Sequence, residues 1–180
     1  MLTLHLYDSK DNSMRRMGYA AEYCADYSVR QGRCLSDRPD TIHAAVTSLA
    51  DVQTQIEAVG KRVLTIDMMW IHTHGAPGYV HLPGGGITES NVGTLRPACS
   101  TYLAMPATII FAGCNVGEGG PGERFLKAAG AAMLGHGGGH IVSSDSVTFS
   151  VPLLGQRRPI WSSIVEASVA PGGAVTVVTR

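Results

Sequence analysis

One cysteine and one histidine of this chain each follow an apolar run, and each has glycine beside it. Cys114 comes directly after ATIIFAG, and His74 comes after MMWIHT and directly before Gly75. A cysteine thiolate attacks carbonyl carbons, a histidine can serve the leaving group as a general acid, and backbone amides stabilise the oxyanion that forms. Glycine allows the backbone to approach a substrate closely. These residue types predict acyl-transfer chemistry at a site that contains both Cys114 and His74.

For the two residues to meet, the fold must place the ends of their apolar runs side by side. The sequence alternates runs typical of strands with runs typical of helices. Expected strands cover 1–8, 62–75, 107–113, 140–150 and 173–179, expected helices cover 12–29, 42–60, 89–104, 122–134 and 157–168, and a hairpin is expected over 79–88. This alternation predicts an α/β sandwich with a largely parallel sheet. Ligands bind such a sheet at the carboxyl ends of its strands, which is where His74 and Cys114 are expected.

The composition is that of one ordinary soluble domain spanning residues 1–180. Hydrophobic residues make up 44% of the chain, and 14 Lys and Arg balance 14 Asp and Glu. This neutrality argues against binding to nucleic acid or to anionic lipid, and no run approaches the ~18 apolar residues of a membrane span. The first residues lack the pattern of a signal peptide, so a cytoplasmic location is expected. Cys24, Cys34, Cys99 and Cys114 are therefore expected to be thiols rather than disulfides.

The histidines leave a second hypothesis open. His72 and His74 would point to the same side of a strand, and His81, His136 and His140 are further candidate ligands for a metal. Zinc hydrolases bind their metal through such side chains. No carboxylate or third ligand stands at a recognisable spacing, so a metal hydrolase is the weaker hypothesis. His72 is interpreted instead as a strand-end residue packed near the site.

Three segments together carry a family resemblance. They are DMMWIHTHGAPGYVHLPGGGIT, ATIIFAGCNVGEGGPGERFLKAAGAAMLG and HIVSSDS. In their order and spacing they resemble the caspase-like fold of clan CD cysteine peptidases, and most of all its CHAT-type members and their gingipain, separase and metacaspase relatives. The resemblance implies a three-layer caspase-haemoglobinase-like sandwich around the largely parallel sheet. Gly113 stands where most relatives have Ala or Ser, and Asn115-Val116-Gly117 stands where many CHAT members have Glu-Thr-Gly.

The resemblance also implies roles for particular residues. Cys114 would be the nucleophile and His74 the general acid/base, the amides of Gly75 and Cys114 would form the oxyanion hole, and no cofactor would take part. Asp145 follows the third apolar strand, where related proteins often carry residues of the specificity pocket, which suggests cleavage after Lys or Arg. A capping or turn aspartate is the alternative interpretation of Asp145.

The activity that the resemblance implies is that of a cysteine endopeptidase. It would cleave a protein or peptide substrate through a thioester, and the short chain leaves room for an activating protein partner. The alternative hypothesis is a caspase-like interaction module of a signalling or defence assembly, in which the two residues are present but unused. The two hypotheses predict different reactivity for the Cys114 thiol.

Overall fold

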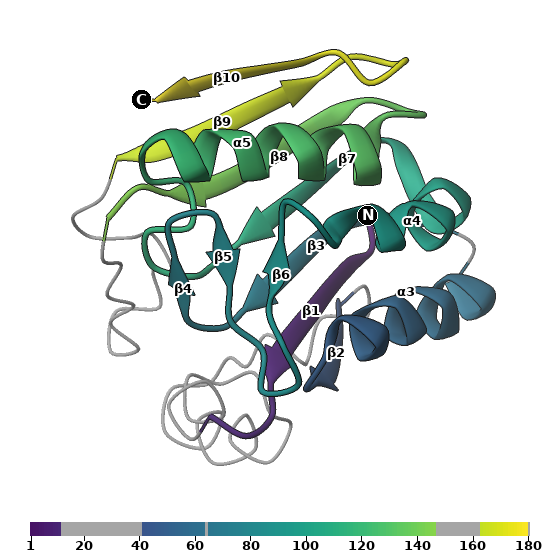
Figure 1. Cartoon of the computed structure of the whole chain (residues 1–180). Coiled ribbons are helices and arrows are strands. Elements are labelled where there is room, and N and C mark those ends of the chain that lie inside the picture. Colours follow the sequence, from purple (N-terminus) through teal and green to yellow (C-terminus); the bar gives the residue numbers. More distant parts are fainter. Residues whose placement is uncertain (12–40, 64, 147–162, 180) are drawn as a thin grey trace, which may run out of the picture.

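The computed structural model describes residues 1–11, 41–63, 65–146 and 163–179 (Figure 1). Within these ranges, seven strands form one sheet. In their order across the sheet they are β10 (Val175–Thr179), β9 (Ile164–Val169), β8 (Gly139–Ser144), β7 (Leu103–Phe111), β3 (Ile66–His72), β1 (Thr3–Asp8) and β2 (Thr41–Val46). Strands β2, β1, β3, β7 and β8 run parallel to one another, whereas β9 is antiparallel to β8 and β10 is antiparallel to β9. The predicted α/β class with a mostly parallel central sheet is confirmed.

The apolar residues of the inner strands alternate so that one face of the sheet is fully buried. Leu4 of β1 lies beside Met69 of β3, and Leu6 lies beside Ile71, with all four side chains inaccessible to solvent. Successive residues of a strand point to opposite faces of the sheet. Apolar residues at every second position therefore all lie on the same face, and this face packs into the core. The sheet therefore holds its parallel strands rigidly up to their carboxyl ends.

The described helices cover this buried face. They are α3 (Leu49–Val63), the 3-10 turn η3 (Val92–Leu95), α4 (Arg96–Tyr102), α5 (Gly119–Ala129) and η4 (Gly130–Leu134), which continues α5 as a π-helical turn. In Figure 1, α3, α4 and α5 lie on the same side of the sheet, and they contact one another directly or through η4. A second helical layer, which a three-layer sandwich needs, is not seen within the described residues. The helix predicted over 12–29 lies outside them.

A small antiparallel sheet follows β3. It consists of β4 (Gly75–Ala76), β5 (Tyr79–Val80) and β6 (Ile87–Thr88), in that order. The pairing of Tyr79 with Thr88 confirms the hairpin predicted over 79–88. Since β4 starts directly after His74, this small sheet fixes the backbone on the carboxyl side of the candidate histidine.

One expected helix was placed too early in the chain. Residues 42–60 were expected to be helical throughout, but Thr41–Val46 form strand β2 and α3 begins only at Leu49. Ile42 and Val46 fit both the helical spacing and, with Ala44 between them, a period of two, and pairing with β1 decides between the two patterns. Asp51 then accepts hydrogen bonds from the backbone and the hydroxyl of Thr47 at the start of α3.

The helix expected over 157–168 is wrong for its described part. Residues Ile164–Val169 form strand β9, antiparallel to β8, because Val165, Ala167 and Val169 alternate with more exposed residues and fill the core face. Residues 157–162 and 147–150 lie outside the described ranges. The helix expected over 89–104 is split into η3 and α4 and gives way to β7 at Leu103.

The remaining expected elements are present with shifted ends. Strand β3 is shorter than 62–75 because α3 extends to Val63, and β7 begins four residues before the expected 107. The helix expected over 122–134 begins at Gly119. No helix among the described residues combines the length and the apolar character that crossing a membrane requires.

Candidate active site

The candidate catalytic residues lie at the carboxyl edge of the parallel strands. His74 comes two residues after the end of β3, and Cys114 comes three residues after the end of the neighbouring strand β7. Strands β7 and β8 are added to the sheet on one side of β3, whereas β1 and β2 lie on its other side. The order in which the chain adds strands to the sheet therefore reverses between β1 and β3. In open α/β sheets, ligands bind beyond the carboxyl ends of the strands at such a point.

Two glycines bring the segments of His74 and Cys114 into direct backbone contact. A Cβ atom placed on Gly75 would lie 2.6 Å from the Cys114 carbonyl oxygen and would overlap the side chain of Val116. A Cβ atom on Gly113 would lie 3.2 Å from the Gly75 nitrogen. At Gly75 only glycine permits this approach without moving the backbone, whereas at Gly113 a Cβ atom would make an unusually tight contact. The structure therefore places the segments of the predicted pair, and the predicted oxyanion residue Gly75, side by side.

The Gly75 amide faces away from its partner strand in the small sheet. The His81 amide donates to the His74 carbonyl over 2.9 Å, and Gly75 is paired with Val80, one position further along. Because hydrogen-bonded and non-hydrogen-bonded pairs alternate in an antiparallel ladder, the Gly75–Val80 pair is the non-bonded kind. Its N–H is left pointing out of the ladder, as an oxyanion donor requires.

The turn that carries Cys114 is held against the end of β8. The Asn115 amide donates to the Ser146 carbonyl over 3.1 Å, and the Gly117 amide donates to the Ser144 carbonyl over 2.8 Å. Asn115 has a φ of 60°, a left-handed conformation that is uncommon outside glycine, and its buried Oδ1 accepts no hydrogen bond from the described residues. The turn is thus fixed at Asn115 and at Gly117, and the first of these residues has a sparsely populated backbone conformation, as residues at many functional sites do.

Asp145, the predicted specificity residue, lies between Ser144, the last residue of β8, and Ser146, and the Cys114 turn is docked on the carbonyls of these two serines. Both of its carboxylate oxygens are 2.7 Å from the Ser163 hydroxyl, and its amide faces the Ser163 carbonyl. The structure therefore brings Asp145 to the same edge as Cys114. Ser163 lies 18 residues further along the chain, so these contacts are not the local hydrogen bonds that a capping or turn aspartate makes.

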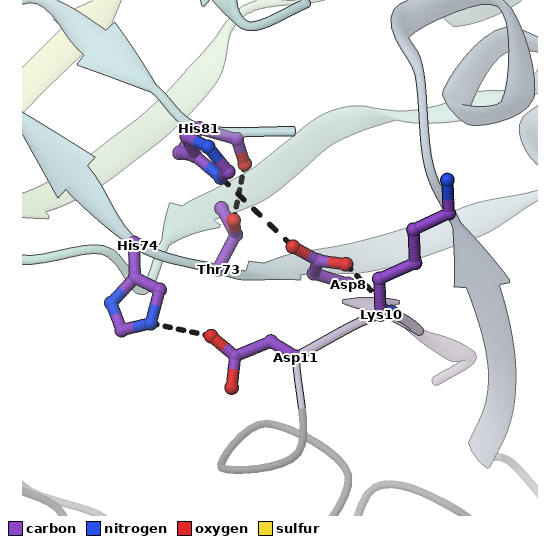
Figure 2. A network of polar contacts seen from close by, with 6 residues as sticks. All are labelled: Asp8, Lys10, Asp11, Thr73, His74 and His81. Carbon is purple, nitrogen blue, oxygen red and sulfur yellow. Dashed lines mark hydrogen bonds and ion pairs between the residues drawn. The ribbon is translucent and has the colours of Figure 1, made fainter. Parts of the chain in front are cut away.

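His74 has a carboxylate partner that sequence reasoning missed. Its Nε2 lies 2.5 Å from Oδ2 of Asp11, three residues after the end of β1 (Figure 2). The His74 side chain is 57% exposed and the Asp11 side chain 17% exposed. The contact joins the two strands between which the strand order changes direction, so it lies within the predicted ligand-binding edge.

A second histidine and carboxylate lie beside this pair. His81 Nδ1 is 4.0 Å from Oδ2 of the buried Asp8, and the Thr73 hydroxyl donates to the His81 carbonyl (Figure 2). Asp8 also accepts a hydrogen bond from the Lys10 amide over 2.9 Å. The signal for both carboxylates was present as two aspartates directly after the first expected strand, at the edge where ligands bind.

The other histidines have separate surroundings. His72 ends β3 in a buried position, and its Nε2 is 2.8 Å from Nδ1 of His5. His140 Nδ1 lies 2.8 Å from Oε1 of Glu166 on β9, and His136 lines an open pocket with Arg96. No group of three or more potential metal ligands occurs within the described ranges. The His72-x-His74 pair does not form a strand-borne ligand pair, because β3 ends at His72.

The two described cysteines differ in accessibility. Cys99 on α4 is fully buried, and desolvation raises the pKa of its thiol to about 12. Cys114 is only partly buried, at the edge of the sheet. A thiolate is the reactive form of cysteine, so Cys99 is an inert internal reference for Cys114. Cys24 and Cys34 lie outside the described residues.

A protein family matches the part of the chain that contributes most of this edge of the sheet. Residues 26–148 match a family described as a domain of unknown function, DUF4347. The chain belongs to the DUF4347 family. The matched region includes His74, Gly75, Cys114 and Asp145, whereas Asp11 lies before it. No curated protein matches the chain.

Proposed function

We propose that this DUF4347 chain is a cysteine endopeptidase with Cys114 as nucleophile and His74 as general acid/base. The observation that carries the proposal is the backbone contact of Gly75 with the Gly113–Cys114 segment at the carboxyl edge of the sheet. His74 and Cys114 are 40 positions apart in the sequence, and their segments meet at Gly75, which has no room for a side chain, and at Gly113, where a Cβ atom would be tightly packed. The predicted oxyanion amide of Gly75 lies at the same contact.

The chemistry follows from these positions. His74 accepts the proton of the Cys114 thiol, and the thiolate attacks the carbonyl carbon of a peptide bond. The amides of Gly75 and Cys114 stabilise the negative oxygen that forms. The C–N bond then breaks, and His74 donates a proton to the leaving amine. Water attacks the resulting thioester with His74 as base, which releases the acid product and restores the thiol. No step requires a cofactor.

The strand arrangement supports the finer fold proposal. A largely parallel sheet with His74 after one strand and Cys114 after its neighbour is the arrangement implied by the resemblance to caspase-like clan CD peptidases. The proposed architecture is the three-layer caspase-haemoglobinase-like sandwich. We further propose cleavage after a basic residue, with the carboxylate of Asp145 as its binding partner, since Asp145 adjoins the residues that hold the Cys114 turn.

The test is limited alkylation by iodoacetamide under native conditions, followed by intact-mass and peptide analysis. Wild type, Cys114→Ala and His74→Ala are compared over a graded pH series. An activated pair predicts labelling of Cys114 ahead of the other cysteines, and slower labelling in His74→Ala. The buried Cys99 is the built-in reference, because its thiol reacts only after unfolding.

A peptide library then tests turnover and specificity. The proposal predicts hydrolysis after Lys or Arg by wild type, and loss of hydrolysis by Cys114→Ala with an unchanged circular dichroism spectrum. Asp145→Asn is expected to weaken the preference for basic residues. Labelling of Cys114 no faster than that of Cys99, together with no hydrolysis of any peptide, would overturn the proposal in favour of the silent interaction module.

A further inference from the structure

We propose that Asp11 is a positioning residue for His74, which holds the imidazole through Nε2 and leaves Nδ1 to serve the substrate. This inference rests on the proposed function of His74. It adds a third residue to a pair that the sequence predicted as Cys114 and His74 alone. The carrying observation is the 2.5 Å contact between His74 Nε2 and Asp11 Oδ2 (Figure 2).

Asp11 is presented to His74 by a braced turn. The buried carboxylate of Asp8, at the end of β1, accepts the Lys10 amide over 2.9 Å, and the Ser9 amide faces the Val46 carbonyl of β2 at 3.4 Å. Aspartate bonded to the amide two residues ahead is a local turn that fixes the direction of the chain. The chain therefore leaves β1 in a defined direction, and Asp11 is the next residue after this brace.

His74 is fixed from its other side. Its carbonyl accepts the His81 amide over 2.9 Å, and the following Gly75 packs against the Cys114 carbonyl. The His81 carbonyl is in turn held by the Thr73 hydroxyl. The backbone of His74 is thus constrained by the small sheet and by the Cys114 turn, and the remaining freedom of the residue is rotation of its side chain. The contact with Asp11 removes that freedom.

The contact also selects a tautomer. A carboxylate that faces one imidazole nitrogen favours the proton on that nitrogen, so neutral His74 carries its hydrogen on Nε2 and a lone pair on Nδ1. Among the described residues, no hydrogen bond or ion pair reaches Nδ1 of His74. Nδ1 is therefore the atom that donates a proton to the leaving amine and accepts one from the attacking water.

A positioning role for Asp11 and an ordinary surface ion pair lead to different kinetic results when Asp11 is replaced. Exposed pairs contribute little to stability, and their loss alters no chemical step. A positioning role predicts that Asp11→Asn lowers kcat by about 10²–10⁴-fold, because the asparagine amide can donate to Nε2 and favour the opposite tautomer, as in serine peptidases. KM should change by less than about two-fold, since binding of the substrate ground state is untouched. Asp11→Glu, which keeps the carboxylate, should recover part of kcat.

The readout independent of turnover is the ¹⁵N spectrum of the histidine side chains in the full chain, assigned with His74→Gln. Wild type should show neutral His74 with a protonated Nε2, and Asp11→Asn should show a shift towards protonated Nδ1. Glu57→Gln is the matched control, because it removes one exposed carboxylate from α3 and should leave both the spectrum and kcat unchanged.

The two proposals fail in distinguishable ways. A wild type that hydrolyses no peptide defeats the proposed peptidase activity, while the His74 tautomer still reports on Asp11. An unchanged His74 spectrum in Asp11→Asn overturns the positioning role even where wild type is active. A fall in kcat with an unchanged spectrum also overturns it, because Asp11 would then act on something other than the imidazole.

Discussion

Histidines occur in two very different regions of this molecule. On the sheet face opposite Leu4 and Leu6, the rings of His5 and His72 stack with each other and with Trp70, and His43 stacks on His5. His5 and His72 are almost completely buried. The ring planes lie within 12° of one another. At the carboxyl edge, His74 and His81 are about half exposed, and each faces a carboxylate.

The difference shows which histidines are available for proton transfer. A buried ring that is stacked and hydrogen-bonded to another ring contributes to packing, and an uncompensated charge there would be expensive. An exposed ring that is held by a carboxylate has a fixed orientation, and its other nitrogen remains accessible to a substrate. His72 and His74 are separated by one residue, yet the end of β3 between them divides packing from candidate chemistry.

Removal of the buried His72 ring should have the largest effect on the stability of the fold. His72→Ala takes away a buried side chain and the partner of His5 Nδ1, so we expect a loss of about 2–4 kcal/mol in the free energy of unfolding. His74→Ala should change it by less than about 0.5 kcal/mol, because that side chain is exposed. Urea unfolding of both variants measures the contrast. Equal losses would abolish the distinction between the two regions.

Filling the glycine contact should have the next largest effect. Gly75→Ala places a methyl group against the Cys114 carbonyl and Val116, so we expect a loss of about 1–3 kcal/mol in stability. Slower alkylation of Cys114 should accompany it. Gly93→Ala is the matched control, since a Cβ atom there meets nothing within 4 Å. Normal labelling and stability of Gly75→Ala would argue against the tight approach of the two segments.

Within the edge itself, the two histidines should differ. His81 lies 4.0 Å from Asp8, a longer contact than that of His74 with Asp11, and its backbone is what holds His74. His81→Ala keeps that backbone, so we expect less than about a ten-fold loss of peptide hydrolysis, against about 10²–10⁴-fold for His74→Ala. Steady-state rates with the best library peptide decide this. A larger loss in His81→Ala would make His81 the acid/base.

The smallest effect concerns a carboxylate away from the histidines. Hydrogen bonds from the Thr47 side chain, then its amide, hold the pKa of Asp51 below its usual 3.8. The ionised form therefore stabilises the folded state above that value, and the contribution is lost as the pH falls through the lowered pKa. Asp51→Asn should unfold at lower urea than wild type at pH 6, and the gap should narrow below pH 4. A gap independent of pH would contradict the assignment.

Much of the candidate site could be predicted because its strands are apolar and continuous. The runs before His74 and Cys114 are too hydrophobic to lie anywhere but in a buried sheet, and glycine after each marks the end of the run. Where two periodicities coincide, prediction failed. Ile42 and Val46 fit a helix as well as a strand, and pairing with β1 selects the strand.

The carboxylate partner of His74 could not be predicted in the same way. Asp11 and His74 are 63 positions apart in the sequence, and no local spacing relates them. Their contact depends on the neighbouring position of β1 and β3 in the sheet and on the turn that Asp8 braces. Polar residues that follow different strands come together only because of the order of the strands in the sheet. A search for carboxylates at the end of each expected strand would therefore have found Asp11.

The position of β1 inside the sheet, between the edge strand β2 and β3, has a consequence for the order of folding. Near the start of this strand, the Leu2 amide donates over 2.6 Å to Asp67, 65 residues further along the chain. Pairing between such distant segments requires closure of a long loop, which slows folding. During synthesis, the first strand must wait for β3 to emerge from the ribosome. A nascent chain therefore cannot bring Asp11 to His74 until its earliest strand has docked beside β3, so the proposed active site is completed only after this pairing.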